Sequence, residues 1–182
     1  KAFIEGVQGT GDEFLDSNHI MATAKHFIGD GGTFKGIDKG DTRISEGGLK
    51  NIHGTPYYSA FEACVQSVMA SFNSWNGVKM HGHKYLLTDV LRDQMGFNGL
   101  VVGDWNGHGE VPGCTNANCP ESFNAGVDIY MAPDEWKELY TNTVRAVKAG
   151  DISEDRLDDA VRKILTVKDR LGMLDGRKPH EY

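Results

Sequence analysis

Gly99-Leu100-Val101-Val102-Gly103-Asp104-Trp105 is the stretch around which the chain is organised. Its apolar centre is short and rich in β-branched residues, which is typical of a strand buried on both faces. Gly103 then lets the backbone turn or approach a neighbour closely. Asp104 therefore stands where a buried strand ends, the position at which α/β enzymes place their chemistry. The alternative is that Asp104 closes a turn or caps the next segment.

Strand and helix patterns alternate along the whole chain. Such alternation predicts βα crossovers and a parallel sheet. Two architectures fit: a doubly wound sheet that is complete in itself, or half of a (β/α)8 barrel, since four βα units are too few to close one. The expected strands are residues 20–24, 68–72, 100–102 and 127–131, and the expected helices are residues 1–8, 56–65, 86–91, 121–125, 135–149 and 154–171.

Characteristic residues mark the ends of several expected helices. Thr55 followed by Pro56 reads as an N-cap with proline at the first helical position. Gly150 ends one helix, and Ser153 caps the next. Residues 34–47 read as a long polar loop, and loops of this length in compact domains usually serve a function.

The composition is that of an ordinary globular chain of 182 residues, with 25% charged and 39% hydrophobic residues. The net charge is −7, without a basic run, which argues against nucleic acid or an anionic membrane as a partner. No apolar stretch is long enough to span a bilayer. Because Lys1 lies inside a helical pattern, we expect an excised or mature piece, and the missing signal peptide says nothing about location.

Three cysteines are present, and they carry different expectations. Cys64 lies in a helical pattern and is expected to be a small buried apolar residue. Cys114 and Cys119 flank a short loop, and a disulfide between them would indicate an oxidising compartment. The alternatives are a free pair of thiols, or a zinc site that adds His81 and His83.

Polar residues follow all the expected strands, and in a barrel these strand ends converge on one face. Carboxylates and cationic donors bind hydroxyl groups, and indole faces stack on a pyranose ring, so the set suits a sugar. The structural alternatives are an ion pair between Lys25 and a core carboxylate, a hydrogen-bonded His26, and burial of Trp75 and Trp105 in the core. The residues concerned are Lys25, His26, residues 73–76, Asp104, Trp105 and Asp134.

Two other kinds of chemistry are disfavoured. The loop Gly29-Asp30-Gly31-Gly32-Thr33 lacks the spacing of known phosphate-binding loops. The chain also has no G-x-S-x-G elbow, which argues against a serine hydrolase mechanism.

Three blocks of sequence carry a family resemblance. They are residues 25–33 (Lys-His-Phe-Ile-Gly-Asp-Gly-Gly-Thr), 74–81 (Ser-Trp-Asn-Gly-Val-Lys-Met-His) and 99–105. In this order and spacing they resemble glycoside hydrolase family 3, in its β-glucosidase and exo-β-glucanase branch. The N-acetylhexosaminidase branch is disfavoured, because it carries Gly-His-Gly where this chain has Gly29-Asp30-Gly31.

The resemblance implies a retaining glycosidase that releases glucose from the non-reducing end of β-glucosides without a cofactor. Asp104 would be the nucleophile that forms a covalent glycosyl-enzyme, although Gly103 replaces the serine of the family's Ser-Asp-Trp block. The substrate would be a β-linked gluco-oligosaccharide. Its non-reducing sugar would be held by Lys25, His26, Trp105, Met69 and Phe72, the last of which replaces a tyrosine of the family.

The resemblance also implies that residues 1–182 form the carboxyl half of a (β/α)8 barrel domain. In this branch the acid/base glutamate lies in an α/β sandwich domain after the barrel, so we expect it outside this chain. A periplasmic or secreted location is expected, and a homodimer is compatible with the sequence. The alternative functions are a non-catalytic carbohydrate-binding or scaffold domain on the same fold, and a self-contained flavodoxin-like domain that binds an anion.

Overall fold

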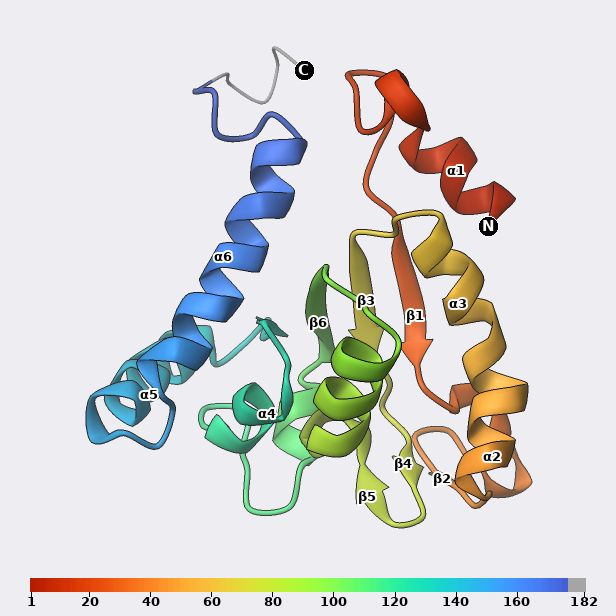
Figure 1. Cartoon of the computed structure of the whole chain (residues 1–182). Helices are drawn as coiled ribbons and strands as arrows, with labels where there is room; N and C mark the ends of the chain where they lie inside the picture. The colour runs from red at the N-terminus through yellow and green to blue at the C-terminus, as the bar shows by residue number, and fades with distance from the viewer. Residues whose placement is uncertain (177–182) are drawn as a thin grey trace.

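A four-stranded parallel sheet forms the centre of the chain in a computed structural model that describes residues 1–176 (Figure 1). The order of the strands in the sheet follows their order in the sequence. The predicted α/β alternation with parallel strands is therefore confirmed. The strands are β1 (Thr23–Phe27), β3 (Ser67–Ala70), β6 (Leu100–Trp105) and β7 (Ile129–Met131).

The strand order separates the two architectures that fit the sequence. A doubly wound sheet needs a point at which the strand order reverses, and β1-β3-β6-β7 has no such point. Each crossover therefore leads in the same direction, and right-handed crossovers then place the connecting helices on one face. Figure 1 shows α3 beside β1, while α4, α5 and α6 follow on the side of β6.

Helices of three kinds connect the strands. The α-helices are α1 (Ala2–Gln8), α2 (Glu46–Gly48), α3 (Thr55–Glu62), α4 (Pro120–Ala125), α5 (Trp136–Ala149) and α6 (Glu154–Arg170). The π-type helices are η4 (Leu49–Gly54) and η6 (Tyr85–Gln94). Short 3-10 turns are η1 (Gly11–Glu13), η2 (Asp30–Gly32), η3 (Phe34–Gly36), η5 (Met80–Gly82) and η7 (Gly107–Glu110).

The predicted ends of the last two helices are confirmed. Gly150 ends α5 in the left-handed conformation, at φ 85°. The Ser153 hydroxyl oxygen accepts a hydrogen bond from the Arg156 backbone N–H at 3.2 Å, and α6 begins there.

The start of the helix before β3 was predicted wrongly. The helix begins at Ser45, whose side chain accepts the Gly48 N–H, and it continues through α2, η4 and α3. Thr55 is helical and its hydroxyl donates back to the Asn51 carbonyl at 2.8 Å. Pro56 lacks an N–H, and a π-type segment directly before it accommodates the break in hydrogen bonding.

The segment predicted as a polar loop at residues 34–47 is therefore shorter and partly ordered. It holds η3 and the two-residue strand β2 (Asp41–Thr42) before Ser45. Strand β2 pairs with β4 (Ser74–Trp75), which pairs with β5 (Val78–Lys79), in a second small sheet. Figure 1 shows this sheet beyond the carboxyl ends of β1 and β3.

Cys64 is exposed, which contradicts its predicted burial. Helix α3 ends at Glu62, and Cys64 takes a left-handed backbone conformation at φ 54°. The apolar stripe of the helix thus stops before it reaches this cysteine.

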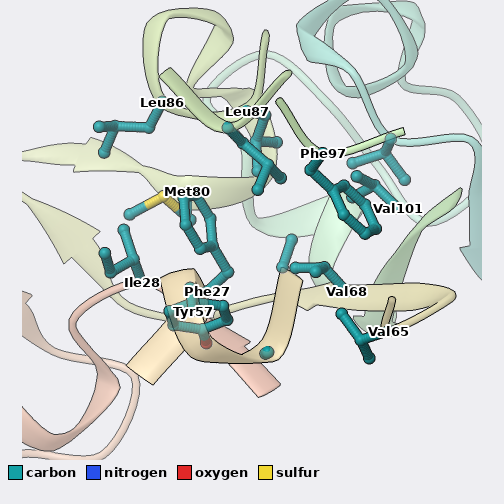
Figure 2. Close-up of a cluster of buried hydrophobic side chains, with 14 of the residues drawn as sticks. Phe27, Ile28, Tyr57, Val65, Val68, Met80, Leu86, Leu87, Phe97 and Val101 are labelled. Carbon is teal, nitrogen blue, oxygen red and sulfur yellow. The ribbon is translucent and has the colours of Figure 1, made fainter. Parts of the chain in front are cut away.

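The main apolar cluster packs helices against one face of the sheet. Val68 of β3 and Val101 of β6 have no exposed surface and belong to this cluster. Figure 2 shows Phe27 next to Met80, with Tyr57 on its other side. The rings of Phe27 and Tyr57 meet edge to face, with centroids 4.9 Å apart. Burial of each such side chain stabilises the fold by about 1.5–3 kcal/mol.

The other face of the sheet is less covered by the described residues. Met69 and Val102 are register partners on neighbouring strands. Since side chains alternate along a strand, both point away from the face that carries Val68 and Val101. Both remain partly exposed, and neither belongs to the apolar cluster.

A buried ion-pair network lies at the amino ends of β6 and β7, remote from Asp104. The Asp128 side chain is fully buried between Arg92, at 2.6 Å, and Arg156, at 3.0 Å. Its carboxylate also accepts the Val101 N–H at 2.8 Å. The network joins η6, β6, β7 and α6.

None of the helices within residues 1–176 combines the length and apolarity needed to cross a lipid bilayer.

Candidate active site

Asp104 is the last residue but one of β6. The strand runs further than predicted and ends at Trp105. The Asp104 side chain is 17% exposed. Its Oδ1 atom accepts the Trp105 backbone N–H at 2.7 Å, and its Oδ2 atom lies 3.5 Å from Nε2 of His26. The carboxylate is thus oriented by one backbone donor and faces one imidazole.

His26 stands between two carboxylates. Its Nε2 atom faces Asp104, and its Nδ1 atom lies 3.1 Å from Oδ2 of Asp30. Asp30 opens the 3-10 turn directly after β1, so the turn brings an acid back to a side chain of the strand. Asp30 therefore fixes the orientation of the ring beside Asp104. The sequence placed Asp30 in a disfavoured phosphate loop and in the family block of residues 25–33, without a role beside His26.

Lys25 and Met69 are less closely tied to Asp104. Lys25 is exposed, and it takes part in none of the ion pairs found within residues 1–176, so its predicted alternative as a core ion pair is wrong. The peptide bond between Lys25 and His26 is cis. Met69 faces Val102 across the sheet. Within the part of the chain that the structure describes, no hydrogen bond or ion pair joins Lys25 or Met69 to Asp104.

The two tryptophans differ from each other. Trp105 is 59% exposed beside Asp104, so it is available to stack on a ligand and is no core residue. Trp75 is partly buried, and its indole N–H donates to the Ile44 carbonyl at 2.8 Å. Trp75 therefore secures the loop before α2, which is a structural role.

A cavity of about 760 Å³ runs along the free side of β1. Lys25, His26 and Asp30 line it, together with residues of α1 and α3. Asp104 does not line this cavity, so the carboxylate and the cavity meet only through His26.

Phe72 packs beside a cluster of charged side chains that was not predicted from the sequence. Lys39 places its ammonium 4.2 Å from the centre of the Phe72 ring. Glu110 accepts hydrogen bonds from Lys39, at 3.1 Å, and from Lys79, at 2.8 Å. Burial opposes ionisation of Glu110, but the two lysines outweigh it and hold the pKa below its ordinary value. The cluster ties β5 to the segments that follow β1 and β6.

His81 is a second residue, after Asp30, whose contact at the candidate site was not predicted from the sequence. It is 2% exposed, and its Nε2 atom accepts the Asp104 backbone N–H at 2.8 Å. Burial lowers the pKa of His81 to about 4, although the nearby Asp104 carboxylate favours the charged form. The imidazole is therefore neutral at neutral pH and acts as an acceptor.

We expect His81 to make the protein less stable as the pH falls from 6.5 toward 4. Above this window the imidazole is neutral in both states, whereas within it the unfolded chain binds a proton that the buried ring excludes. The pKa difference corresponds to about 3 kcal/mol of unfolding free energy, lost as the pH drops to the lower limit. Chemical unfolding of wild type and His81→Gln across this range measures the effect, and equal pH slopes for both proteins would contradict it.

Cys114 and Cys119 are joined by a disulfide, with a Cα–Cα distance of 4.8 Å. The bond closes the loop between η7 and α4. Both thiols are used, so neither the free pair nor the zinc site with His81 and His83 describes this structure. The nearby His108 is 1% exposed, and its ring packs 4.7 Å from that of Tyr130.

Fold and site together define an α/β protein with a cluster of polar side chains at the carboxyl end of a parallel sheet, around the mostly buried Asp104. The chain belongs to glycoside hydrolase family 3: residues 1–167 match the model of the glycosyl hydrolase family 3 N terminal domain. The predicted resemblance is therefore confirmed.

Several relatives are similar over nearly the whole chain. The exo-1,3/1,4-beta-glucanase ExoP from a Pseudoalteromonas species is 53% identical, with a TM-score of 0.95, over 97% of this chain and 22% of that one. A beta-xylosidase from Formosa agariphila is 38% identical over 97% of this chain and 26% of its own length. A periplasmic beta-glucosidase from Salmonella typhimurium is 31% identical over 99% and 24%, respectively. The chain thus spans about a quarter of the length of the relatives it matches.

Proposed function

We propose that this chain supplies the nucleophile of a retaining, exo-acting β-glucosidase or exo-β-glucanase, and that Asp104 is that nucleophile. The observation that carries the proposal is the placement of Asp104. A family 3 chain holds this carboxylate, 17% exposed, at the carboxyl end of a parallel strand, beside an imidazole and an exposed indole. Relatives named as a beta-glucosidase and an exo-1,3/1,4-beta-glucanase support the substrate class.

In the proposed reaction the Asp104 oxygen attacks the anomeric carbon and forms a C–O bond to it. The glycosidic C–O bond breaks, and its oxygen leaves with a proton from a carboxylic acid about 5–5.5 Å from the nucleophile. Water, deprotonated by that same group, then attacks the anomeric carbon and frees Asp104. A nucleophile must have a free lone pair aimed at the anomeric carbon, and the Trp105 N–H orients the carboxylate through its hydrogen bond to Oδ1.

The neighbouring side chains provide the proposed sugar subsite. Lys25 and His26 donate to hydroxyl groups of the non-reducing glucose, and Asp30 holds His26 in place. Trp105 stacks on the apolar face of a sugar ring. Met69 and Phe72 line the subsite, and Phe72 offers an apolar ring without a hydroxyl donor. No cofactor takes part in this mechanism.

We further propose that the four βα units form the carboxyl half of a (β/α)8 barrel. The one-directional strand order and the partly exposed Met69 and Val102 support this arrangement, because the inner face of a barrel is covered only when the ring is closed. The acid/base group belongs to a following α/β sandwich domain in the same proposal. Relatives about four times longer than the matched region have room for both.

The nucleophile can be identified by covalent trapping. The natural polypeptide that contains this chain is treated with a 2-deoxy-2-fluoro-β-glucoside that has a good leaving group. The fluorine slows both steps by destabilising the positively charged transition state, and the leaving group restores only the first. We expect the sugar to accumulate on Asp104, as located by peptide mass spectrometry. Labelling of any other residue would overturn the assignment.

The same experiment separates the alternative function, a non-catalytic carbohydrate-binding or scaffold domain on the same fold. Such a domain would bind glucosides without covalent labelling and without release of the leaving group. A matched 2-fluoro-xyloside should label more slowly in a glucosidase, because it lacks the hydroxymethyl group. Faster labelling by the xyloside would assign a β-xylosidase, as one relative is named.

A periplasmic or secreted location is proposed with this function. The Cys114–Cys119 disulfide supports it, since such bonds persist in oxidising compartments, and so does the relative named as periplasmic. Fractionation of the source cells checks the location, and recovery with cytosolic markers would contradict it.

A further inference from the structure

His81 connects two strand ends at the proposed site. It lies in η5, and the ring reaches the backbone of β6, where Nε2 accepts the Asp104 N–H at 2.8 Å. The ring also interacts with the backbone of Ser71, directly after β3. The imidazole is therefore a bridge between the segment that carries Phe72 and the strand that carries Asp104.

One glycine, Gly107, makes room for this bridge, and a second, Gly103, lies within contact distance of it. A Cβ atom on Gly107 would lie 2.3 Å from Cε1 of the His81 ring, which is not sterically allowed. A Cβ atom on Gly103 would lie 3.4 Å from Cδ2 of the ring. The Phe72 ring covers the imidazole with centroids 5.8 Å apart. The chain thus has no side chain at Gly107, where the ring sits, and the ring fills the space that this glycine leaves.

The hydrogen bond to Asp104 sets the tautomer of the ring. A backbone N–H can only donate, so Nε2 must be unprotonated and the proton of the neutral ring lies on Nδ1. Asp104, His108 and Glu110 are the titratable groups that interact with the ring. Asp104 is consequently held twice: His81 fixes its main chain, and the Trp105 N–H fixes its carboxylate.

We propose that His81 is a positioning residue that aims the Asp104 carboxylate at the anomeric carbon by anchoring the Asp104 main chain. The inference rests on the proposed nucleophilic role of Asp104. It accounts for a fully buried, neutral imidazole at the end of β6, where a carbonyl group from an adjacent strand would ordinarily accept the N–H. A displacement of about 1 Å at a reacting group can cost roughly 100-fold in rate.

Two variants of the natural polypeptide separate positioning from simple packing. His81→Leu keeps much of the volume but removes the acceptor, and we expect the rate of glycosylation of Asp104 to fall by about 10- to 100-fold, with KM little changed. In His81→Gln the amide oxygen reaches the same N–H, and most of the rate should return. The matched control, His83→Leu, removes a ring that packs 5.6 Å from Trp75 and should keep the wild-type rate.

A folded His81→Leu enzyme with the wild-type glycosylation rate would overturn the inference, and so would a His81→Gln enzyme as slow as His81→Leu. A measurement on the wild type tests the inference even if the variants fail to fold. Long-range ¹H–¹⁵N spectra of histidine-labelled protein should show His81 with a bare Nε2, and a proton on Nε2 would overturn the inference. The nucleophile assignment fails separately, if the fluoroglucoside labels a residue other than Asp104 in wild type.

Discussion

Replacement of Asp104 by alanine should lower the turnover of an aryl β-glucoside by about 10⁴-fold or more. This corresponds to an activation free energy that is higher by roughly 5 kcal/mol. Without the carboxylate no covalent glycosyl-enzyme can form. Glucose binding should survive, because Lys25, His26 and Trp105 remain. Stopped assays of the natural polypeptide measure the turnover, and calorimetric titration with glucose measures the binding.

External azide provides a positive control for this variant. The small anion can occupy the space of the missing carboxylate, attack the anomeric carbon and displace the aryloxide. The expected product is a glycosyl azide of inverted configuration, formed at a rate that rises with azide concentration. Asp93→Ala removes an exposed acid on η6 and should leave turnover unchanged. Hydrolysis by Asp104→Ala at the wild-type rate would exclude the nucleophilic role.

The second large effect is expected on stability, at the other end of the sheet. Asp128→Ala leaves two arginines and the Val101 N–H without their common partner in a buried site. Removing one member of such a network typically costs about 3–5 kcal/mol, because the remaining charges stay buried and unpaired. We expect the melting temperature to fall by roughly 10 °C in scanning calorimetry.

Asp159→Ala is the matched control for this change. Asp159 pairs with Lys163 and lies 3.6 Å from Arg156, but its side chain is 42% exposed. Exposed ion pairs are worth about 0–1 kcal/mol, so this variant should melt close to the wild type. Equal losses in both variants would show that the Asp128 network contributes no more than a surface pair.

The parallel sheet and several helix ends could be predicted from sequence because their signals are local. Apolar runs such as Leu100–Val102 mark strands, and Gly150 and Ser153 mark helix ends through their own backbone preferences. The helix start at Ser45 was missed because Gly47 and Gly48 follow it, and glycine is a poor helix former. Thr55-Pro56 carried the stronger start signal, but the chain already turns as a helix ten residues earlier.

The candidate site was predictable only in part, for a different reason. Asp104 and His26 sit at strand ends, and the sheet topology brings strand ends together. The partners that fix them depend on contacts between distant segments. His81 reaches Asp104 across 23 residues, and Lys39 reaches Glu110 across 71. No periodicity or motif in residues 78–83 predicts that the His81 imidazole points toward β6.

The one-directional order of the sheet bears on how the protein is made. Each new strand of the four-stranded sheet pairs with the strand of that sheet that left the ribosome before it, so none of β3, β6 and β7 must wait for a later strand to find a neighbour. Each of these pairings can therefore form as soon as the next strand of the sheet has been synthesised, because chains fold from the N-terminus during synthesis. Asp128 would meet Arg92 and Val101 first, and Arg156 would arrive last. The final helix α6 would then lock a sheet that had already been assembled, strand by strand, in the order of translation.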